Sequence, residues 1–240
     1  MNWGLPPDWS TRGHEIDGLI SLVHWVMLAL AVFWFGYFLF VLWRFRAGST
    51  AKRRPPRGRW ALALAGAILV FELALLVGFE IPKWEARQVL PSHENAFVVR
   101  VTAEQFAWNF HYPGEDGVFG PTSADRIDAY NPVGLDVDHP DAADDLVTIN
   151  QLHLPMGRTI LLELGSKDVI HGFYLPYFRV KQDVLPGRLV PVSFQPTRMG
   201  TSEIACAQLC GLGHYRMRGQ ITVQPEDEFE AWYQDELAYM

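Results

Sequence analysis

Residues 19–43 read LISLVHWVMLALAVFWFGYFLFVLW, a run of 25 residues with no charged side chain. As an α-helix this run would be about 37 Å long, enough to cross the hydrocarbon core of a bilayer. A second apolar run, residues 60–81, contains Glu72 near its middle. Soluble core helices seldom continue for roughly 18 or more residues without a charge. We therefore predict two transmembrane helices, at 19–43 and 60–81, rather than two buried helices of a soluble core.

The loop between the two runs, residues 44–59, is strongly basic. It contains no acidic residue and seven basic ones: Arg44, Arg46, Lys52, Arg53, Arg54, Arg57 and Arg59. By the positive-inside tendency this loop stays in the cytoplasm, so the helices form an antiparallel hairpin. Residues 1–18 and everything after about Ile81 are then extracytoplasmic. Residues 1–18 have neither a basic n-region nor a small-residue cleavage site, so we expect the first helix itself to act as export signal.

Glu72 lies near the middle of the second predicted span and is the one acidic residue of its apolar run 60–79. An ionisable group in the membrane is costly and usually faces a protein partner or a polar path. We expect Glu72 to face a partner subunit or to be protonated, with either a structural or a proton-related role.

The extracytoplasmic part is acidic, with 21 Asp or Glu against 10 Lys or Arg from His93 onward. This balance argues against nucleic-acid binding and favours a basic soluble partner guided by electrostatic attraction. A surface that merely keeps the domain soluble would have the same charge, so charge alone leaves both interpretations open.

After a polar connector at 82–96, the chain has the pattern of an all-β domain over residues 97–225. Residues 97–112 read as one strand, and residues 113–145, rich in Pro, Gly and Asp, read as a long loop. Further strand candidates follow at spacings of about 10 residues, which is typical of an antiparallel sandwich or barrel. They are residues 146–154, 159–166, 169–178, 188–196 and 217–225. The tail, 226–240, has helical spacing of Phe229, Trp232, Tyr233 and Leu237, which predicts a terminal helix packed on the domain.

The segment EIACAQLCGLGHYRM, residues 203–217, brings Cys206, Cys210, His214 and Met217 within twelve positions. Thiolate, imidazole and thioether form a soft ligand set that favours copper over zinc. A continuous helix would also align the two cysteines and the histidine, as a structural arrangement. Two glycines within three residues each cost a helix about 1 kcal/mol, so we favour a loop folded around an ion.

A single blue-copper site needs one cysteine, so the second cysteine suggests two thiolates that bridge two coppers. Each copper then needs a terminal nitrogen ligand, and a second histidine is required. His171 is the preferred candidate because it follows an alternating strand and precedes a glycine. Spacing alone leaves His153 as an alternative.

The segments EQFAWNF (104–110), SKDVIHGFYLPYFRVKQDVLPGR (166–188) and CAQLCGLGHYRM (206–217), in this order after two spans, resemble subunit II of haem-copper oxidases of the cytochrome c oxidase class. The resemblance implies a cupredoxin-like Greek-key barrel that holds a binuclear CuA centre. It implies that the centre takes electrons from cytochrome c and passes them to haem in catalytic subunit I, for oxygen reduction coupled to proton translocation. The implied copper ligands are Cys206 and Cys210 as bridges, His171 and His214 as terminal imidazoles, and Met217 and the Gln208 carbonyl as axial ligands.

Three positions depart from the commonest pattern of that family. Many members have Glu where this chain has Gln208, and the side chain of that Glu also binds a magnesium or manganese ion at the border with the catalytic subunit. Gln208 lacks this negative charge, which weakens the case for the ion. The aromatic run that receives the electron often begins with Trp directly after Gln, whereas here Phe106 follows and Trp108 comes two residues later, so either or both receive the electron. An acidic residue common before the second span has no counterpart in RRPPRGRW.

Three other functions share parts of this pattern. A membrane-tethered copper-binding assembly protein would hold copper without passing electrons, and oxidase relatives that accept quinol would hold a structural disulfide in place of the ligands. Nitric oxide reductases of the same superfamily can carry a similar copper subunit.

The sequence has no C-x-x-C-H haem motif, so we expect a separate cytochrome c as donor. We expect the chain in a bacterial cytoplasmic membrane with other oxidase subunits, its copper domain on the periplasmic or outer face.

Overall fold

The computed structural model describes residues 4–50 and 58–239. These residues divide into two compact units, one formed by residues 18–50 and 58–89 and the other by residues 4–17 and 90–239.

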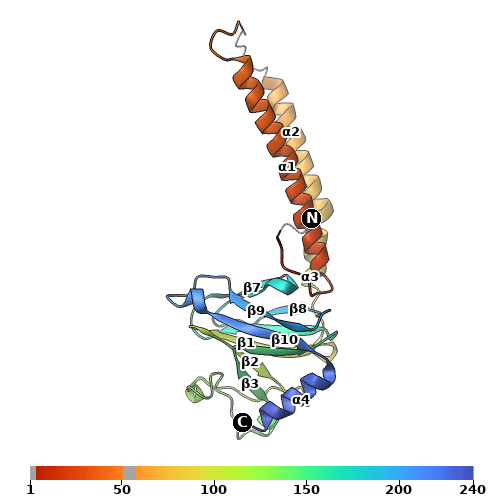
Figure 1. Cartoon of the computed structure of the whole chain (residues 1–240). Helices are drawn as coiled ribbons and strands as arrows, with labels where there is room; N and C mark the ends of the chain where they lie inside the picture. The colour runs from red at the N-terminus through yellow and green to blue at the C-terminus, as the bar shows by residue number, and fades with distance from the viewer. Residues whose placement is uncertain (1–3, 51–57, 240) are drawn as a thin grey trace. The chain divides into compact units, whose positions relative to one another are not determined.

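The helical unit contains α1 (Gly13–Arg44) and a second helical stretch that runs from Gly58 to Gln88. The second stretch consists of α2 (Gly58–Leu75), one π-helical turn η1 (Leu76–Glu80) and α3 (Ile81–Gln88). Figure 1 shows α1 and α2 side by side. The helices Gly13–Arg44 and Gly58–Ala86 are both long and apolar enough to cross a membrane, with mean hydropathies of 2.3 and 2.5.

Both apolar runs therefore lie inside helices that extend beyond them. The first half of the expected connector, 82–96, is helical rather than irregular because α3 continues from the π-turn to Gln88. Four of the seven basic loop residues, Lys52, Arg53, Arg54 and Arg57, lie outside the described residues.

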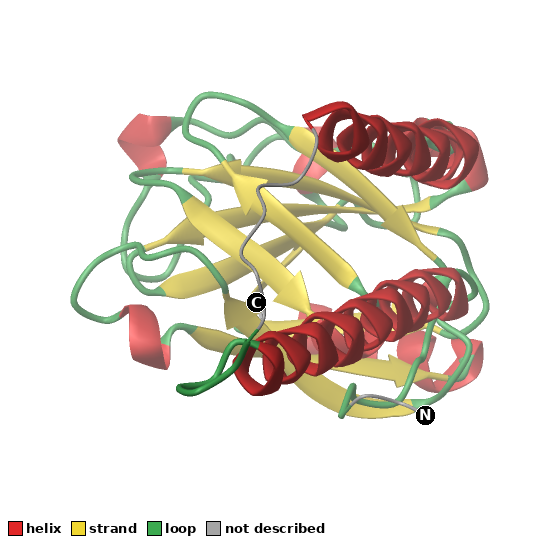
Figure 2. Ribbon diagram, turned by 90° about the horizontal axis from the view of Figure 1, so that it is seen from above, coloured by secondary structure: helices red, strands yellow, loops and turns green. Residues whose placement is uncertain are grey.

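The second unit is built on two five-stranded sheets (Figure 2). The first sheet has the order β3 (Leu146–Ile149), β2 (Ala107–Tyr112), β1 (Phe97–Glu104), β5 (Ile160–Ser166) and β8 (Val190–Phe194). The second has the order β4 (Gln151–Pro155), β10 (Arg218–Gln224), β9 (Gly200–Cys206), β6 (His171–Leu175) and β7 (Val180–Val184). Short helical turns connect them: η2 (His93–Asn95), η3 (Ala124–Arg126), η4 (Pro140–Ala142), η5 (Pro176–Phe178) and η6 (His214–Arg216). This arrangement confirms an all-β domain of the cupredoxin type.

Several strand predictions were wrong in detail. Residues 97–112 are two strands, β1 and β2, which pair as a tight hairpin with Glu104 opposite Ala107. Residues 146–154 are also two strands, in different sheets, separated by Asn150 at a φ of 59°. Strands β7 and β9 were not predicted, and the β1–β5 and β4–β10 pairs are parallel, so the sheets are mixed rather than antiparallel. Alternation of apolar and polar residues predicts two faces but specifies neither a strand's direction nor a two-residue turn.

The core lies between the sheets and is rich in aromatic side chains. Trp108, Phe110, Tyr112 and Phe173 are all fully buried. Residues 226–237 form the helix α4 (Glu226–Leu237), which buries Phe229 and Tyr233 and adds Trp232 to the same cluster. The helix therefore completes the core at one end of the β domain.

The N-terminal segment adds a short strand-like stretch to the β domain. The N–H of Trp9 donates to the carbonyl of Tyr177 at 2.8 Å, and its carbonyl accepts from the N–H of Thr197 at 2.8 Å. The Trp9 ring packs edge-on against Tyr177 and Phe178, with ring centroids 4.8 and 6.1 Å away. The residues before the first membrane helix are therefore part of the same folded unit as residues 90–239.

Arg179 holds this segment in place. Its side chain is only 7% exposed, pairs with Asp17 at 2.7 Å and donates to the carbonyls of Pro6 and Pro176, both at 2.6 Å. We expect Arg179→Ala to lower the free energy of unfolding by about 2 kcal/mol, because the half-buried carboxylate of Asp17 and two carbonyls lose their charged donor. Denaturant unfolding of the full chain in detergent, followed by circular dichroism, measures this change. Arg198→Ala, at an exposed arginine, is the control. An equal effect of both substitutions would contradict the role of Arg179 in holding the N-terminal segment on the β domain.

Candidate metal centre

Cys206 is the last residue of β9, and Cys210, His214 and Met217 lie on the connection between β9 and β10. These strands are antiparallel neighbours, so the two ends of the connection lie side by side, and the N–H of Cys206 donates to the carbonyl of Met217 at 3.2 Å. The connection is a loop with one short helical turn, η6, and not a continuous helix. Gly211 has a φ of +137°, a conformation that side chains with a Cβ rarely adopt. The loop expected from the two glycines is thus confirmed.

His171 reaches the same place from the neighbouring strand. It is the first residue of β6, which pairs with β9 so that Phe173 lies opposite Cys206. The N–H of Ala207 donates to the carbonyl of Gly172 at 2.8 Å. A Cβ at Gly172 would lie 2.9 Å from the backbone nitrogen of Gln208, so glycine permits the close approach of β6 to the cysteine loop.

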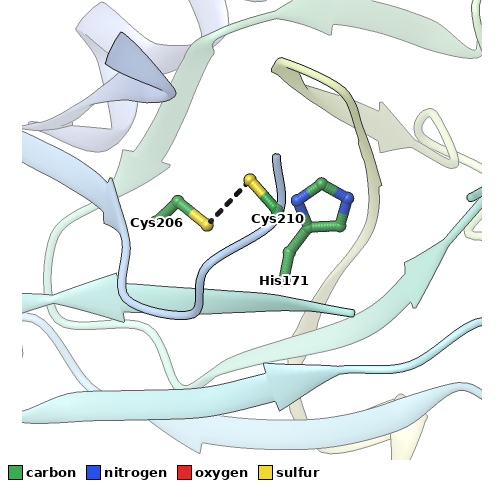
Figure 3. A group of neighbouring side chains, drawn as sticks. All are labelled: His171, Cys206 and Cys210. Atoms are coloured by element: carbon green, nitrogen blue, oxygen red, sulfur yellow. Dashed lines mark hydrogen bonds between the residues drawn. The ribbon is translucent and has the colours of Figure 1, made fainter. Parts of the chain in front are cut away.

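The potential donor atoms converge in one cluster. His171, Cys206 and Cys210 each offer an atom within 4.8 Å of the others. Figure 3 shows the three side chains gathered in one place. The sulfur of Cys210 lies 3.8 Å from the sulfur of Cys206, 3.7 Å from Met217 Sδ and 3.8 Å from His214 Nδ1. His171 Nδ1 lies 3.2 Å from Met217 Sδ. The sulfur of Cys206 lies 3.2 Å from the carbonyl oxygen of Gln208. All six predicted ligand residues are therefore neighbours.

The chemistry of this cluster suits a soft metal ion. Both cysteines are free thiols rather than a disulfide, so their sulfurs remain available as ligands. His171, Cys210 and Met217 are buried, whereas Cys206 and His214 are half-buried. Burial, together with the neighbouring Cys206, raises the pKa of the Cys210 thiol to about 11. Since a metal binds the thiolate, metal binding at neutral pH must release this proton.

Two residues beside the cluster were missed by the sequence analysis. One carboxylate oxygen of Asp168 lies 2.8 Å from His171 Nε2, and the other accepts the backbone N–H of Gln105 at 2.7 Å. The side chain of Gln105 donates to the carbonyl of Cys210 at 2.5 Å. Burial acts to raise the pKa of Asp168, but the hydrogen bonds from His171 and from the N–H groups of Val169 and Gln105 outweigh it and lower that pKa. The signal in the sequence was an acidic residue three positions before a ligand histidine.

The two aromatic residues proposed to receive the electron have different surroundings. Phe106 is half-buried, and its ring occupies the space in front of Gly211 and Gly213, where any Cβ would meet it. Trp108 is fully buried, with its ring centroid 6.0 Å from that of His171 and 5.1 Å from that of Phe173. Phe106 therefore contacts the cysteine loop near the surface, and Trp108 packs behind His171 in the core.

His153 lies away from this cluster. His153 is on β4, at the far edge of the sheet from β7, where its ring stacks on Trp232 with centroids 3.9 Å apart. The structure therefore favours His171 over His153 as the upstream ligand. Glu72 is exposed on α2, and its role stays a prediction.

A cupredoxin-like β domain with a cluster of soft donor atoms, preceded by two apolar helices long enough to cross a membrane, is typical of membrane-anchored copper proteins. Residues 97–224 match the family model described as "Cytochrome C oxidase subunit II, periplasmic domain". The chain is 32% identical over 241 residues to the alternative cytochrome c oxidase subunit 2 of Bradyrhizobium diazoefficiens, covering 99% of this chain and 82% of that one. The chain belongs to the cytochrome c oxidase subunit II family.

A second sequence relative points the same way. Cytochrome c oxidase subunit 2 of Cereibacter sphaeroides is 28% identical over 237 residues, which cover 93% of this chain and 75% of that protein. The crystal structure of the periplasmic domain of subunit II of cytochrome oxidase from Bradyrhizobium japonicum is 27% identical; the match covers 63% of this chain and 99% of that one, with a TM-score of 0.47. Family membership makes this chain the electron-input subunit of a haem-copper oxidase and a component of an oxidoreductase complex with other subunits. It is a membrane protein with a periplasmic domain, and the family implies copper.

Proposed function

We propose that this chain accepts electrons from cytochrome c at a binuclear CuA centre and passes them to haem in the catalytic subunit, where oxygen is reduced and protons are translocated. The observation that supports this most is the convergence of two free thiols, two imidazoles and a thioether from β6 and the β9–β10 loop. In this proposal the thiolates of Cys206 and Cys210, the imidazoles of His171 and His214, the thioether of Met217 and the carbonyl of Gln208 would hold the coppers.

A bridged copper pair, when bound, accepts and releases a single electron with its charge spread over several atoms. The chain contributes a donor set held on paired strands, with the imidazole of His171 fully buried. Neighbouring groups that hydrogen-bond to the ligand residues, and that largely shield them from water, restrict movement of the ligands. Oxygen chemistry is assigned to the catalytic subunit, so the role of this chain is electron transfer. A magnesium or manganese ion at the subunit border stays a prediction, with the neutral, exposed Gln208 as the weak point.

The purified oxidase complex tests this proposal by electron paramagnetic resonance and copper analysis. We expect two coppers per chain beyond those of the catalytic subunit and a hyperfine pattern split equally by two copper nuclei. A single-copper pattern, or copper that does not become reduced by cytochrome c, would instead fit a copper storage protein. Oxygen uptake, measured beside nitric oxide consumption, identifies the terminal acceptor.

The fold also supports the proposed topology. Residues 4–17 and 90–239 belong to one compact unit, which supports placing both segments on one side of the membrane. The helices must then cross an even number of times, which fits two spans joined by the basic loop 44–59 in the cytoplasm. We place residues 1–18, the connector 82–96 and the domain 97–225 with its helical tail 226–240 on the periplasmic face of a bacterial cytoplasmic membrane. The acidic excess of that face, 21 acidic against 10 basic residues from His93 onward, supports a basic cytochrome c as donor.

Phe106 is the aromatic residue that we propose to receive the electron from the donor, because it is half-buried over the cysteine loop while Trp108 is enclosed. Phe106→Ala is expected to slow electron transfer from cytochrome c at least about tenfold, which equals about 1.4 kcal/mol in the barrier. Removing the ring leaves a gap between donor and cysteine loop. Stopped-flow reduction of the complex by cytochrome c measures the rate.

Phe106→Trp is the matched control for this variant, since it keeps an aromatic ring at the position and should keep the rate. Both variants should retain the copper content and spectrum of the original protein. A wild-type rate for Phe106→Ala would contradict the assignment.

A further inference from the structure

The carboxylate of Asp168 connects the histidine ligand, the β1–β2 turn and, through that turn, the cysteine loop. We propose that Asp168 is a positioning residue that fixes the orientation of His171 and holds the Phe106 turn against the metal centre. The inference deepens the proposed function and rests on it, because it concerns how the chain's own residues shape the copper site.

The contact with His171 determines which ring nitrogen faces the cluster. His171 Nε2 lies 2.8 Å from Asp168 Oδ1, and a carboxylate can only accept a hydrogen bond. The proton therefore belongs on Nε2, which leaves the lone pair on Nδ1, the nitrogen that faces Met217 Sδ at 3.2 Å. A carboxylate behind a ligand histidine both selects the tautomer and orients the ring.

The second carboxylate oxygen ties down the turn that carries Phe106. The backbone N–H of Gln105 donates to Asp168 Oδ2 at 2.7 Å, and the Gln105 side chain donates to the carbonyl of Cys210 at 2.5 Å. The turn is thus bound to the histidine side through Asp168 and to the cysteine loop through Gln105. One carboxylate therefore links the orientation of His171 to the position of Phe106.

Asp168 is itself held by its neighbours, so it can act as a fixed point. Its Oδ1 accepts the N–H of Val169 at 2.6 Å and lies 3.3 Å from Ser166 Oγ. The adjacent Lys167 pairs with Glu104 and donates to the carbonyl of Pro132. Asp168 is nevertheless 30% exposed, so the competing explanation is a surface charge that only attracts a basic donor.

Asp168→Asn separates these two explanations. An amide offers one acceptor oxygen and one donor nitrogen, so it cannot accept from both His171 Nε2 and Gln105 N–H. Loss of a hydrogen-bond partner behind a metal ligand typically weakens metal binding by about 10–100-fold. Asp183→Asn is the matched control: it removes the same charge at an exposed position of β7, opposite Gly172, and among the described residues its carboxylate forms no hydrogen bond with a proposed ligand residue.

The experiment uses the purified oxidase complex with each variant and titrates it with a Cu(I) chelator. We expect Asp168→Asn to lose its copper at about 10–100-fold lower chelator concentration than the original protein. We also expect it to show an altered nitrogen hyperfine coupling from His171 in pulsed resonance spectra. Asp183→Asn should match the original protein in both measurements.

The inference is overturned if the two variants retain copper equally, show equal nitrogen coupling and are reduced equally slowly by cytochrome c. Asp168 would then be a surface charge that only attracts the donor. Absence of a copper-pair signal in the original protein would instead overturn the proposed function itself. If Asp168→Asn does not assemble, Asp168→Glu retains the carboxylate but lengthens the side chain by one methylene. It should alter the same nitrogen coupling, and an unchanged coupling would likewise count against the positioning role.

Discussion

Cys210→Ser is expected to lower reduction of the oxidase by cytochrome c by more than about 100-fold, since even hydrogen-bond partners of metal ligands typically account for 10–100-fold. The sulfur of Cys210 is buried and lies within 3.8 Å of three other donor atoms, those of Cys206, His214 and Met217. A serine hydroxyl is a harder donor that copper accepts poorly in place of a thiolate. Copper content should fall and the spectrum of a copper pair should disappear.

The matched control is Ala207→Ser, which places a hydroxyl in the same loop without replacing a donor. It should keep the copper content and most of the rate. The measurements are metal analysis, paramagnetic resonance and stopped-flow reduction of the intact complex. A Cys210→Ser variant that kept a two-copper spectrum would show that Cys210 is not a bridging ligand.

Trp108→Ala is expected to destabilise the β domain by about 3–5 kcal/mol, the usual cost of removing a fully buried large aromatic side chain. Trp108 is completely buried on β2 and packs against His171 and Phe173, so its loss leaves a cavity directly behind the proposed copper ligand. Denaturant unfolding of the full chain in detergent measures the effect.

Tyr130→Ala is the control for this substitution, because Tyr130 is 96% exposed and should change stability by less than about 0.5 kcal/mol. Trp108→Phe keeps much of the packing and should leave reduction by cytochrome c near the original rate. A large loss of rate in Trp108→Phe, with copper retained, would show that Trp108 itself carries the electron.

The sequence by itself determined the two long apolar helices and predicted the loop that carries most of the soft donor residues. An uncharged run such as 19–43 is long enough to specify a helix in lipid without any distant contact. The spacing of Cys206, Cys210, His214 and Met217 is a local property of one loop, and its two glycines already argued against a helix there. Local chemistry of this kind can be interpreted directly because the interacting residues are close in the chain.

Only the tertiary structure decided which distant segments meet. Alternation in residues 97–112 showed two faces, but the hairpin turn at Gln105 and Phe106 and the parallel partner β5 depend on contacts far along the chain. The same holds for Asp168, whose contact with Gln105 spans 63 positions, and for Trp9, which packs on Tyr177. Backbone pairing and hydrogen bonds between remote residues leave no periodic mark in the sequence, so they become visible only in the folded chain.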